Sequence, residues 1–147
     1  MIRAVLDSNV IISGLGTVPA RKSVLSQVID RWRRDDFIVI ASDEIEREVA
    51  TAWKRPYWVN RHPAGFAELT IEFLRQRSFY VSLANQLVGA APHRHDDHVL
   101  QAALAGRCDF IVTGDLELQQ MSASQGIRIV SPDAFLRVLN DAEQDAR

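Results

Sequence analysis

Residues 2–9 are IRAVLDSN and residues 110–115 are FIVTGD, two stretches with the same pattern of residue types. In each, a mainly apolar run stops at polar residues of the kind that form turns. The runs are rich in aliphatic residues and show no regular polar alternation, which is typical of strands buried on both faces of a parallel sheet. The two stretches therefore predict buried strands, the first followed by Asp7 and the second by Asp115.

Strand-like and helix-like segments alternate along the chain. Further strands are predicted at 37–40, 79–83 and 127–130, and helices at 19–32, 42–53, 66–73, 99–104 and after Ser131-Pro132-Asp133. Apolar residues at helical spacing indicate the helices, and Pro56 and Gly106 are typical helix stops. This alternation predicts an α/β fold, a three-layer α/β/α sandwich with a mainly parallel central sheet, formed by residues 1–147 as a single domain.

The composition is that of an ordinary folded domain. The 147 residues are 47% hydrophobic and 24% charged, with a formal net charge of −2, which excludes a disordered chain and a protein that coats nucleic acid by bulk charge. Cys108 is the single cysteine, so no internal disulfide can form. No apolar run approaches the roughly 18 residues of a membrane span, and the N-terminus lacks the pattern of a signal peptide. We therefore expect a cytoplasmic protein that makes no membrane contact and binds nucleic acid, if at all, locally.

Acidic residues gather near the predicted carboxyl ends of the strands, where sites form in parallel sheets. Asp7 and Asp115 follow strands directly, Glu48 lies at the border of the apolar stripe of helix 42–53, and Asp96 and Asp97 precede the helix at 99–104. Each has an ordinary explanation as well, since aspartates form turns and helix caps and a border glutamate can be solvated. Those explanations do not account for four acidic positions at one edge of the sheet.

Such convergence of acidic side chains favours a bound cation. Two carboxylates about 4 Å apart repel each other by about 4 kcal/mol at an effective dielectric constant of 20. Ligation by oxygen without thiolates favours Mg²⁺ or Mn²⁺. The chemistry typical of this kind of cluster is phosphoryl transfer to water, in which the ion polarises the phosphate and lowers the pKa of a bound water.

Four motifs, in this order, resemble the PIN-domain family. They are VLDSNVIISG (5–14), SDEIEREV (42–49), DDHVLQAALAG (96–106) and DFIVTGDLEL (109–118), and the likeness continues to IVSPDAFL (129–136). The most similar subgroup comprises toxin components of toxin–antitoxin systems, relatives of the VapC toxins. The resemblance implies an α/β/α sandwich and a Mg²⁺- or Mn²⁺-dependent endoribonuclease that hydrolyses phosphodiester bonds of single-stranded RNA.

The resemblance also implies roles for individual residues. The positions that match the family's catalytic acids are Asp7, Glu48, Asp96 and Asp115. Asp97 joins them as a metal-ligand candidate, because HRHDD stands here in place of the usual DPDD and leaves open which of Asp96 and Asp97 faces the metal. Ser8 or Asn9 and Thr113 match small polar residues that orient water or the carboxylates. Glu117 stands where the family often has a further aspartate, and its role stays open.

The resemblance extends to partners. It implies an RNA substrate, a cognate antitoxin protein that covers the site, and a homodimer. The alternative hypothesis is a catalytically silent PIN module that binds nucleic acid or a protein partner.

Three histidines precede or follow the Asp96-Asp97 pair. His93, His95 and His98 complete the pattern H-x-H-x-D-H of zinc hydrolases. Those enzymes need further histidines downstream, and none follows His98, so we interpret these residues as a histidine-bearing loop beside the acidic site.

Two groups of basic residues could contact phosphates. One comprises Arg31, Arg33 and Arg34, and the other comprises Lys54, Arg55, Arg61 and His62, interleaved with Trp53, Tyr57 and Trp58. Arginine with aromatic residues can hold phosphates and stack on unpaired bases, so the second group is the better candidate.

Overall fold

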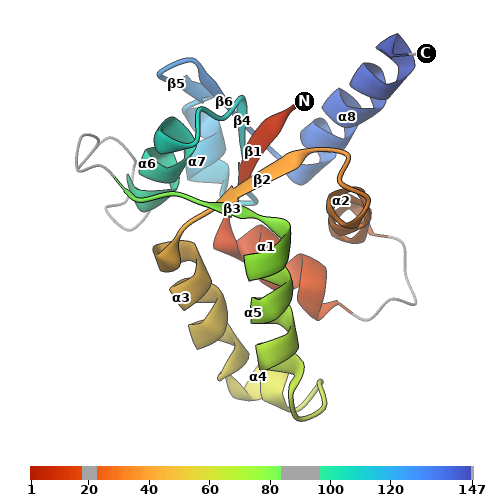
Figure 1. Ribbon diagram of the computed structural model, residues 1–147, viewed down its shortest axis with the longest axis vertical. Coiled ribbons are helices and arrows are strands. Elements are labelled where there is room, and N and C mark those ends of the chain that lie inside the picture. The colour runs from red at the N-terminus through yellow and green to blue at the C-terminus, as the bar shows by residue number, and fades with distance from the viewer. Residues whose placement is uncertain (18–22, 84–96, 147) are drawn as a thin grey trace.

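A six-stranded sheet lies at the centre of the molecule (Figure 1). In the computed structural model, which describes residues 1–17, 23–83 and 97–146, the strand order is β3-β2-β1-β4-β6-β5. The strands are β1 (Arg3–Leu6), β2 (Ile38–Ala41), β3 (Phe79–Tyr80), β4 (Phe110–Val112), β5 (Ala123–Ser124) and β6 (Ile127–Val130). Only the β5–β6 pair in this sheet is antiparallel. The predicted, mainly parallel sheet is thus confirmed.

Helices cover both faces of the sheet. They are α1 (Ser8–Gly16), α2 (Val24–Arg33), α3 (Asp43–Trp53), α4 (Pro56–Val59), α5 (Phe66–Arg77), α6 (Asp97–Ala105), α7 (Leu116–Gln120) and α8 (Pro132–Asp145). Helices α8, α2, α1, α3 and α5 pack side by side in that order, whereas α6 packs on β1, β2 and β4. The crossovers β1 to β2 and β3 to β4 run in opposite directions across the sheet, so right-handed connections place their helices on opposite faces. Figure 1 shows α6 and α7 on one side of the strands and α2 and α8 on the other. The fold is therefore the predicted α/β/α sandwich.

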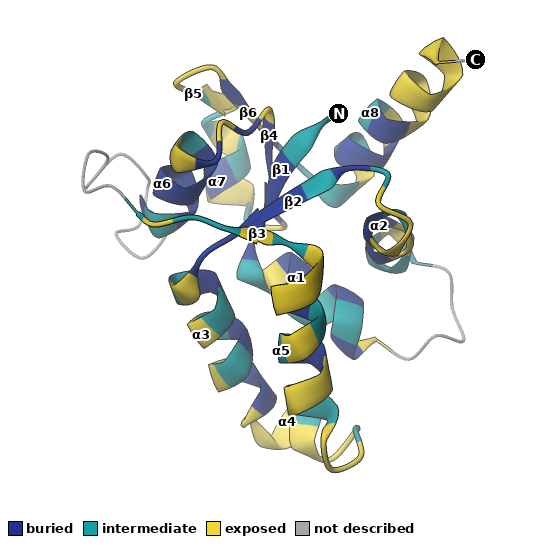
Figure 2. Cartoon of the chain, viewed as in Figure 1, coloured by how far each residue is buried: buried dark blue, intermediate teal, exposed yellow. Residues whose placement is uncertain are grey.

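Strand β1 forms the middle of the core. Ala4, Val5 and Leu6 have no exposed surface, and Figure 2 shows the buried strands enclosed by helices whose outer faces are exposed. In the parallel pair of β1 and β4, Leu6 lies opposite Val112. Because the two strands are neighbours and parallel, the residues that follow them leave the sheet at the same edge, as the sequence predicted for Asp7 and Asp115.

The polar stretches after β1 and β4 begin helices, and this differs from the predicted turns. The Asp7 side chain caps α1 by accepting the backbone N–H of Ser8, and the Asp115 side chain caps α7 by accepting the N–H of Glu117. Val10 and Ile11 of α1 are buried, which explains why the chain turns directly into a helix that packs on α2 and α3. Asp and Asn are common both in turns and at helix N-termini, so the sequence alone does not distinguish a turn from the start of a helix at these positions.

Other boundaries differ in detail. The helix predicted from residue 19 is described from Val24 onwards, with Ser23 as its cap, while residues 18–22 and the predicted loop through Pro92 lie outside the described residues. The strand predicted at 79–83 spans only Phe79–Tyr80. In α5, Thr70 and Leu74 are buried, whereas Leu69 is 68% exposed. Across the described ranges, no helix has both the length and the apolar character needed to span a bilayer.

Candidate active site

One threonine joins the two acidic strand ends. The hydroxyl of Thr113, which is fully buried, donates to Oδ2 of Asp7 at 2.8 Å and accepts the backbone N–H of Asp115 at 3.0 Å. Asp7 is 6% exposed, and its Oδ1 accepts the N–H of Ser8 at 2.8 Å. The structure therefore brings Asp7, Thr113 and the start of the Asp115 loop together, although these residues are separated by more than one hundred positions in the sequence.

The small polar residues predicted beside Asp7 lie at this edge too. The side-chain oxygen of Asn9 accepts the N–H of Gly114 at 3.4 Å, which ties the start of α1 to the loop after β4. Ser8 lines a pocket described below. Glu117 is exposed, and its backbone N–H donates to the Asp115 side chain at 2.9 Å.

Glu48 approaches the same edge from α3. This helix begins directly after β2, where the Ser42 hydroxyl accepts the N–H of Ile45 at 3.2 Å, and Glu48 follows in the second turn. A carboxylate oxygen of Glu48 lies 3.0 Å from Nε2 of His98 on α6. Burial lowers the pKa of His98, but the hydrogen bond and charge of Glu48, together with the charges of Asp7 and Glu44, raise it above its ordinary value overall. Glu48, His98 and Asp7 thus belong to one electrostatic environment.

The role of His98 differs from the sequence-based expectation. His98 lies within helix α6 and contacts an acid of the candidate site, so it is not part of a loop. His93 and His95 lie outside the described residues. The signal that could have identified His98 is its position directly after the Asp96-Asp97 pair, at the predicted start of a helix.

The third acidic position has two candidates, Asp96 and Asp97. Asp97 is the first residue of α6, 5% exposed, and adjoins His98, whereas Asp96 lies outside the described residues. The structure therefore shows that Asp97 is held in a buried position, and it does not test Asp96.

A pocket of about 460 Å³ lies between α1 and α3. Its lining residues combine acidic, basic and neutral side chains: Ser8, Ile12, Glu44, Arg47, Glu48, Thr51, Arg55 and His98. The acid Glu48 and the residue that follows Asp7 therefore face one cavity, which also carries two arginines. Such a cavity can accept an anion beside carboxylates that hold a cation.

The donor set fits a hard divalent cation. Asp7 and Asp97 are buried carboxylates, and a buried carboxylate is costly unless a positive group or hydrogen bonds compensate it. The oxygen donors suit Mg²⁺ or Mn²⁺, and burial raises the pKa of the Cys108 thiol to about 12, so Cys108 offers no thiolate. Among the described residues, no group of three or more His, Cys, Asp or Glu side chains is arranged as a metal site.

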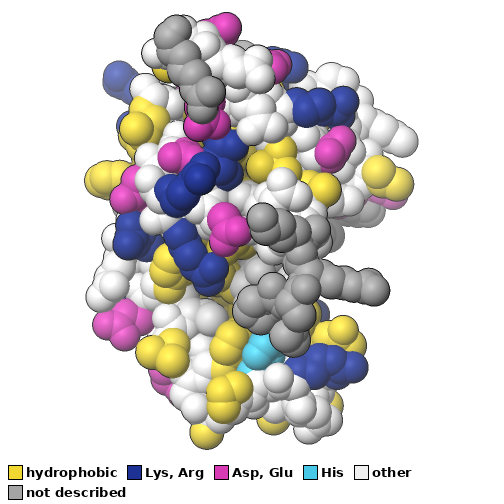
Figure 3. Space-filling model, turned by 90° about the vertical axis from the view of Figure 1, so that its right-hand side faces the viewer, with side chains coloured by type: hydrophobic (Ala, Val, Ile, Leu, Met, Phe, Trp, Pro, Cys, Tyr) yellow, Lys and Arg dark blue, Asp and Glu magenta, His cyan; other side chains and the backbone are white. Residues whose placement is uncertain are grey.

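The first basic group is engaged in ion pairs. Arg31 contacts Asp36 at 2.5 Å, Arg34 contacts the same carboxylate at 2.7 Å, and Arg33 lies 3.7 Å from Asp30. Figure 3, which looks onto the side that carries α2 and α8, shows basic and acidic side chains interspersed there. These arginines stabilise the contact between α2 and its surroundings and are poorly placed to serve the pocket between α1 and α3.

Comparison with known proteins agrees with this fold. The sequence profile of the PIN domain matches residues 3–117, a range that contains Asp7, Glu48, Asp97 and Asp115. No curated protein matches the chain. PIN domains are in general nucleases, which hydrolyse phosphodiester bonds. From the profile match and from an α/β/α sandwich with acidic residues at the carboxyl ends of β1 and β4, the chain belongs to the PIN-domain family.

Proposed function

We propose that this protein is a divalent-metal-dependent endoribonuclease that cleaves single-stranded RNA, and that it is the toxin of a toxin–antitoxin pair. The observation that carries the proposal is the link from Asp7 through the buried Thr113 hydroxyl to Asp115, beside the pocket that Glu48 lines. Membership of the PIN-domain family supports nuclease chemistry, and the oxygen donors support a hard cation.

The acids at the sheet edge would hold Mg²⁺ or Mn²⁺: Asp7, Glu48, Asp96 or Asp97, and Asp115. A divalent ion bound there supplies Lewis-acid polarisation of the phosphate and a lowered pKa for water.

The protein's own residues position these acids. The Thr113 hydroxyl and the Ser8 N–H fix the two oxygens of Asp7, so this carboxylate has one orientation. Nε2 of His98, near the start of α6, lies 3.0 Å from a carboxylate oxygen of Glu48 and holds this side chain in place. Arg47 and Arg55, in the same pocket, attract the negatively charged phosphodiester that the acids alone would repel.

Three further parts of the proposal concern the whole protein. Residues 1–147 form a single domain, and the packing of Phe135 against Phe37 and Phe110 at ring distances of 4.9 and 5.7 Å supports this for the segment beyond residue 117. The protein works in the cytoplasm. An antitoxin covers the pocket between α1 and α3, and the toxin forms a homodimer.

Cleavage of an unstructured RNA with Mn²⁺ or Mg²⁺ tests the catalytic proposal. The wild-type protein should cleave, while Asp7→Asn and Glu48→Gln should lose activity by at least tenfold. Glu46→Gln is the matched control, because Glu46 lies on the same helix but its carboxylate pairs with Arg75 at 2.7 Å on the other side. Circular dichroism confirms that each variant is folded. No cleavage by wild type on any RNA tested, or equal cleavage by wild type and Asp7→Asn, refutes the enzyme and leaves the silent binding module.

A further inference from the structure

Three exposed arginines lie on α3 and on either side of α4. Within the part of the chain that the structure describes, Arg47, Arg55 and Arg61 are exposed and form no ion pair. By contrast, the arginines that pair with carboxylates are Arg31, Arg33, Arg34, Arg75, Arg77 and Arg137. Arg3, Arg107 and Arg128 also lack an ion pair among the described residues, but they lie in β1, after α6 and in β6. Arg47, Arg55 and Arg61 are therefore the arginines near α3 and α4 that are available to an external anion.

Two of these arginines, Arg47 and Arg55, line the pocket between the candidate active site and α4, and Arg61 follows α4 in the sequence. On α3 the pocket passes Glu48 and Thr51, and it continues to Arg55, the residue that precedes α4. On α1 it begins at Ser8, and the end of α1 abuts α4, because a Cβ added to Gly16 would lie 2.5 Å from the Trp58 ring. Helix α4 thus closes the lower end of the groove between α1 and α3.

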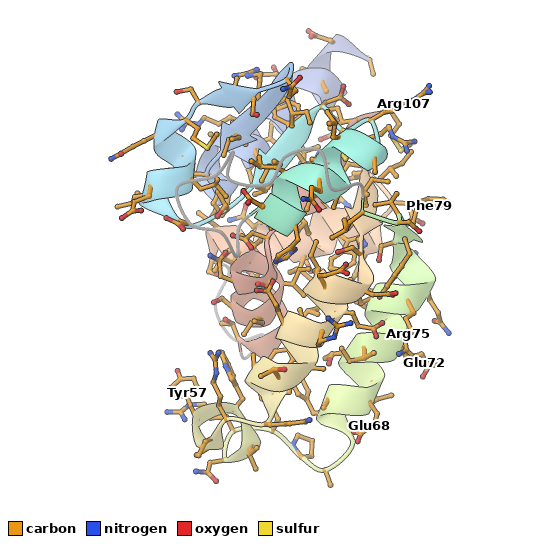
Figure 4. The ribbon with its side chains drawn as sticks, turned by 90° about the vertical axis from the view of Figure 1, so that its left-hand side faces the viewer. Tyr57, Glu68, Glu72, Arg75, Phe79 and Arg107 are labelled. Atoms are coloured by element: carbon orange, nitrogen blue, oxygen red, sulfur yellow. The ribbon has the colours of Figure 1, made fainter. Side chains whose placement is uncertain are left out.

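Helix α4 presents a stacked tyrosine–arginine pair at that end. The guanidinium carbon of Arg61 lies 3.6 Å from the centre of the Tyr57 ring, and Arg61 donates a 2.7 Å hydrogen bond to the Tyr57 carbonyl oxygen. Tyr57 is 56% exposed. Figure 4 shows Tyr57 on the side away from α5, whose labelled residues Glu68, Glu72 and Arg75 point the other way. A fixed, exposed aromatic–guanidinium pair is the kind of surface on which unpaired bases stack.

We infer that an unpaired stretch of RNA follows the groove between α1 and α3, with its phosphates on Arg47 and Arg55 and one base stacked on the Tyr57–Arg61 pair. This inference rests on the proposed function and specifies where its single-stranded substrate binds. It also explains how an anionic RNA can bind beside acidic residues, because Arg47 and Arg55 lie in the same pocket as Glu48. A duplex cannot use the platform, since its bases are already stacked within the helix.

Binding without cleavage tests the inference. We would measure fluorescence anisotropy of a labelled oligouridylate about twelve nucleotides long, in EDTA, against the full-length protein. Tyr57→Ala should weaken binding about tenfold with the same salt dependence, which is the size typical of one lost base stack. Arg55→Ala should weaken binding and also lower the slope of log K against log salt by about 0.7, the value for one phosphate contact on a single strand.

Two matched variants make the test specific. Tyr57→Phe keeps the ring and should bind like wild type. Lys54→Ala removes a neighbouring positive charge, but Lys54 lines a different groove between α3 and α5, so its affinity and salt slope should be unchanged. Thermal denaturation checks that all variants fold.

The outcomes separate this inference from the enzyme proposal. Equal binding by wild type, Tyr57→Ala and Arg55→Ala overturns the groove as the RNA site, as does equal competition by a duplex of the same length or the absence of any binding by wild type. Each of those results can occur while metal-dependent cleavage is intact, because cleavage is measured separately with Mn²⁺. Loss of cleavage in Glu48→Gln with unchanged binding in EDTA supports both proposals.

Discussion

Replacing Thr113 by valine should destabilise the protein and disable the candidate site together. Valine has nearly the same shape as threonine, so the substitution removes the hydroxyl and leaves no large cavity. That hydroxyl donates to the Asp7 carboxylate at 2.8 Å and accepts the Asp115 N–H at 3.0 Å, and Thr113 is fully buried. The variant therefore loses a charge-assisted hydrogen bond and leaves a backbone N–H without its acceptor.

The magnitude follows from these two contacts. A hydrogen bond to a charged group contributes about 1.5–3 kcal/mol, and an unsatisfied buried donor costs about 1–3 kcal/mol. The added methyl group of valine returns about 0.8 kcal/mol of apolar burial. The free energy of unfolding should fall by about 2–5 kcal/mol, which moves the urea midpoint down by about 1–2.5 M at a slope near 2 kcal/mol per M.

Urea denaturation followed by circular dichroism measures this change, and the RNA cleavage assay measures the effect on the site. Thr113→Ser is the control, because it keeps the hydroxyl and loses only one methyl group, at a cost of about 1 kcal/mol. The serine variant should retain most cleavage activity, while the valine variant should fall about 10- to 100-fold. If valine and serine variants have the same stability and activity, the hydroxyl does not join the two acidic strand ends in the way described.

Three further outcomes are expected. Gly16→Ala should lose about 1–2 kcal/mol in urea denaturation, because its Cβ would lie 2.5 Å from the Trp58 ring; unchanged stability would mean that the ring moves aside freely. Burial raises the pKa of Asp36, but hydrogen bonds from Arg34 and Arg31 outweigh burial, so the folded pKa is lower than the ordinary value. Asp36 therefore stabilises the fold above its unfolded pKa of about 3.9. This contribution is lost as the pH falls through the lower folded pKa. Asp36→Asn should therefore be less stable than wild type by about 1 kcal/mol at pH 7, with the gap closing below about pH 4, and a gap independent of pH in urea titrations would contradict the ion pair. Mn²⁺ at 100 times its Kd should stabilise wild type by about 2.7 kcal/mol in thermal scans, and Glu48→Gln should reduce this gain; equal gains would remove Glu48 from the metal ligands.

Five of the six strands and the general location of the site could be predicted from the sequence, whereas the two-residue strand β5 could not. Runs such as those before Asp7 and Asp115 are apolar on both faces, and such runs are rarely found outside a covered parallel sheet. Once β1 and β4 are neighbours, the acids that follow them must share an edge. These inferences need only the order of residues and the geometry of parallel strands.

Helix α1 could not be predicted in the same way, because tertiary packing determines it. Gly14 and Gly16 are weak helix formers, and no polar face marks the segment as amphipathic. The structure explains Gly14: a Cβ there would lie 2.6 Å from the Ile29 side chain, so glycine lets α1 approach α2 closely. A glycine that weakens the helix locally thus strengthens its packing, and sequence periodicity does not contain that information.

The pairing of Glu48 with His98 was beyond sequence reasoning for a different reason. The two residues lie fifty positions apart on helices that follow different strands, and only their spatial arrangement shows the 3.0 Å contact. The same holds for the unpaired state of Arg55 and Arg61, which depends on where every carboxylate of the described chain lies. Sequence composition identified these residues as basic, but it could not distinguish them from the arginines of α2 that are held in ion pairs.

The hydrogen bond between Thr113 and Asp7 joins residues 106 positions apart, and this separation has a consequence for protein synthesis. At roughly 5–20 residues per second, a ribosome adds Thr113 about 5–20 s after Asp7. During that interval the growing chain has β1 and β2 but not the neighbouring β4, so Asp7 has neither its hydroxyl partner nor the second acid beside it. Because β1 and β4 are neighbours in the sheet but distant in the sequence, the acidic site of the proposed function is completed only after β4 has been synthesised.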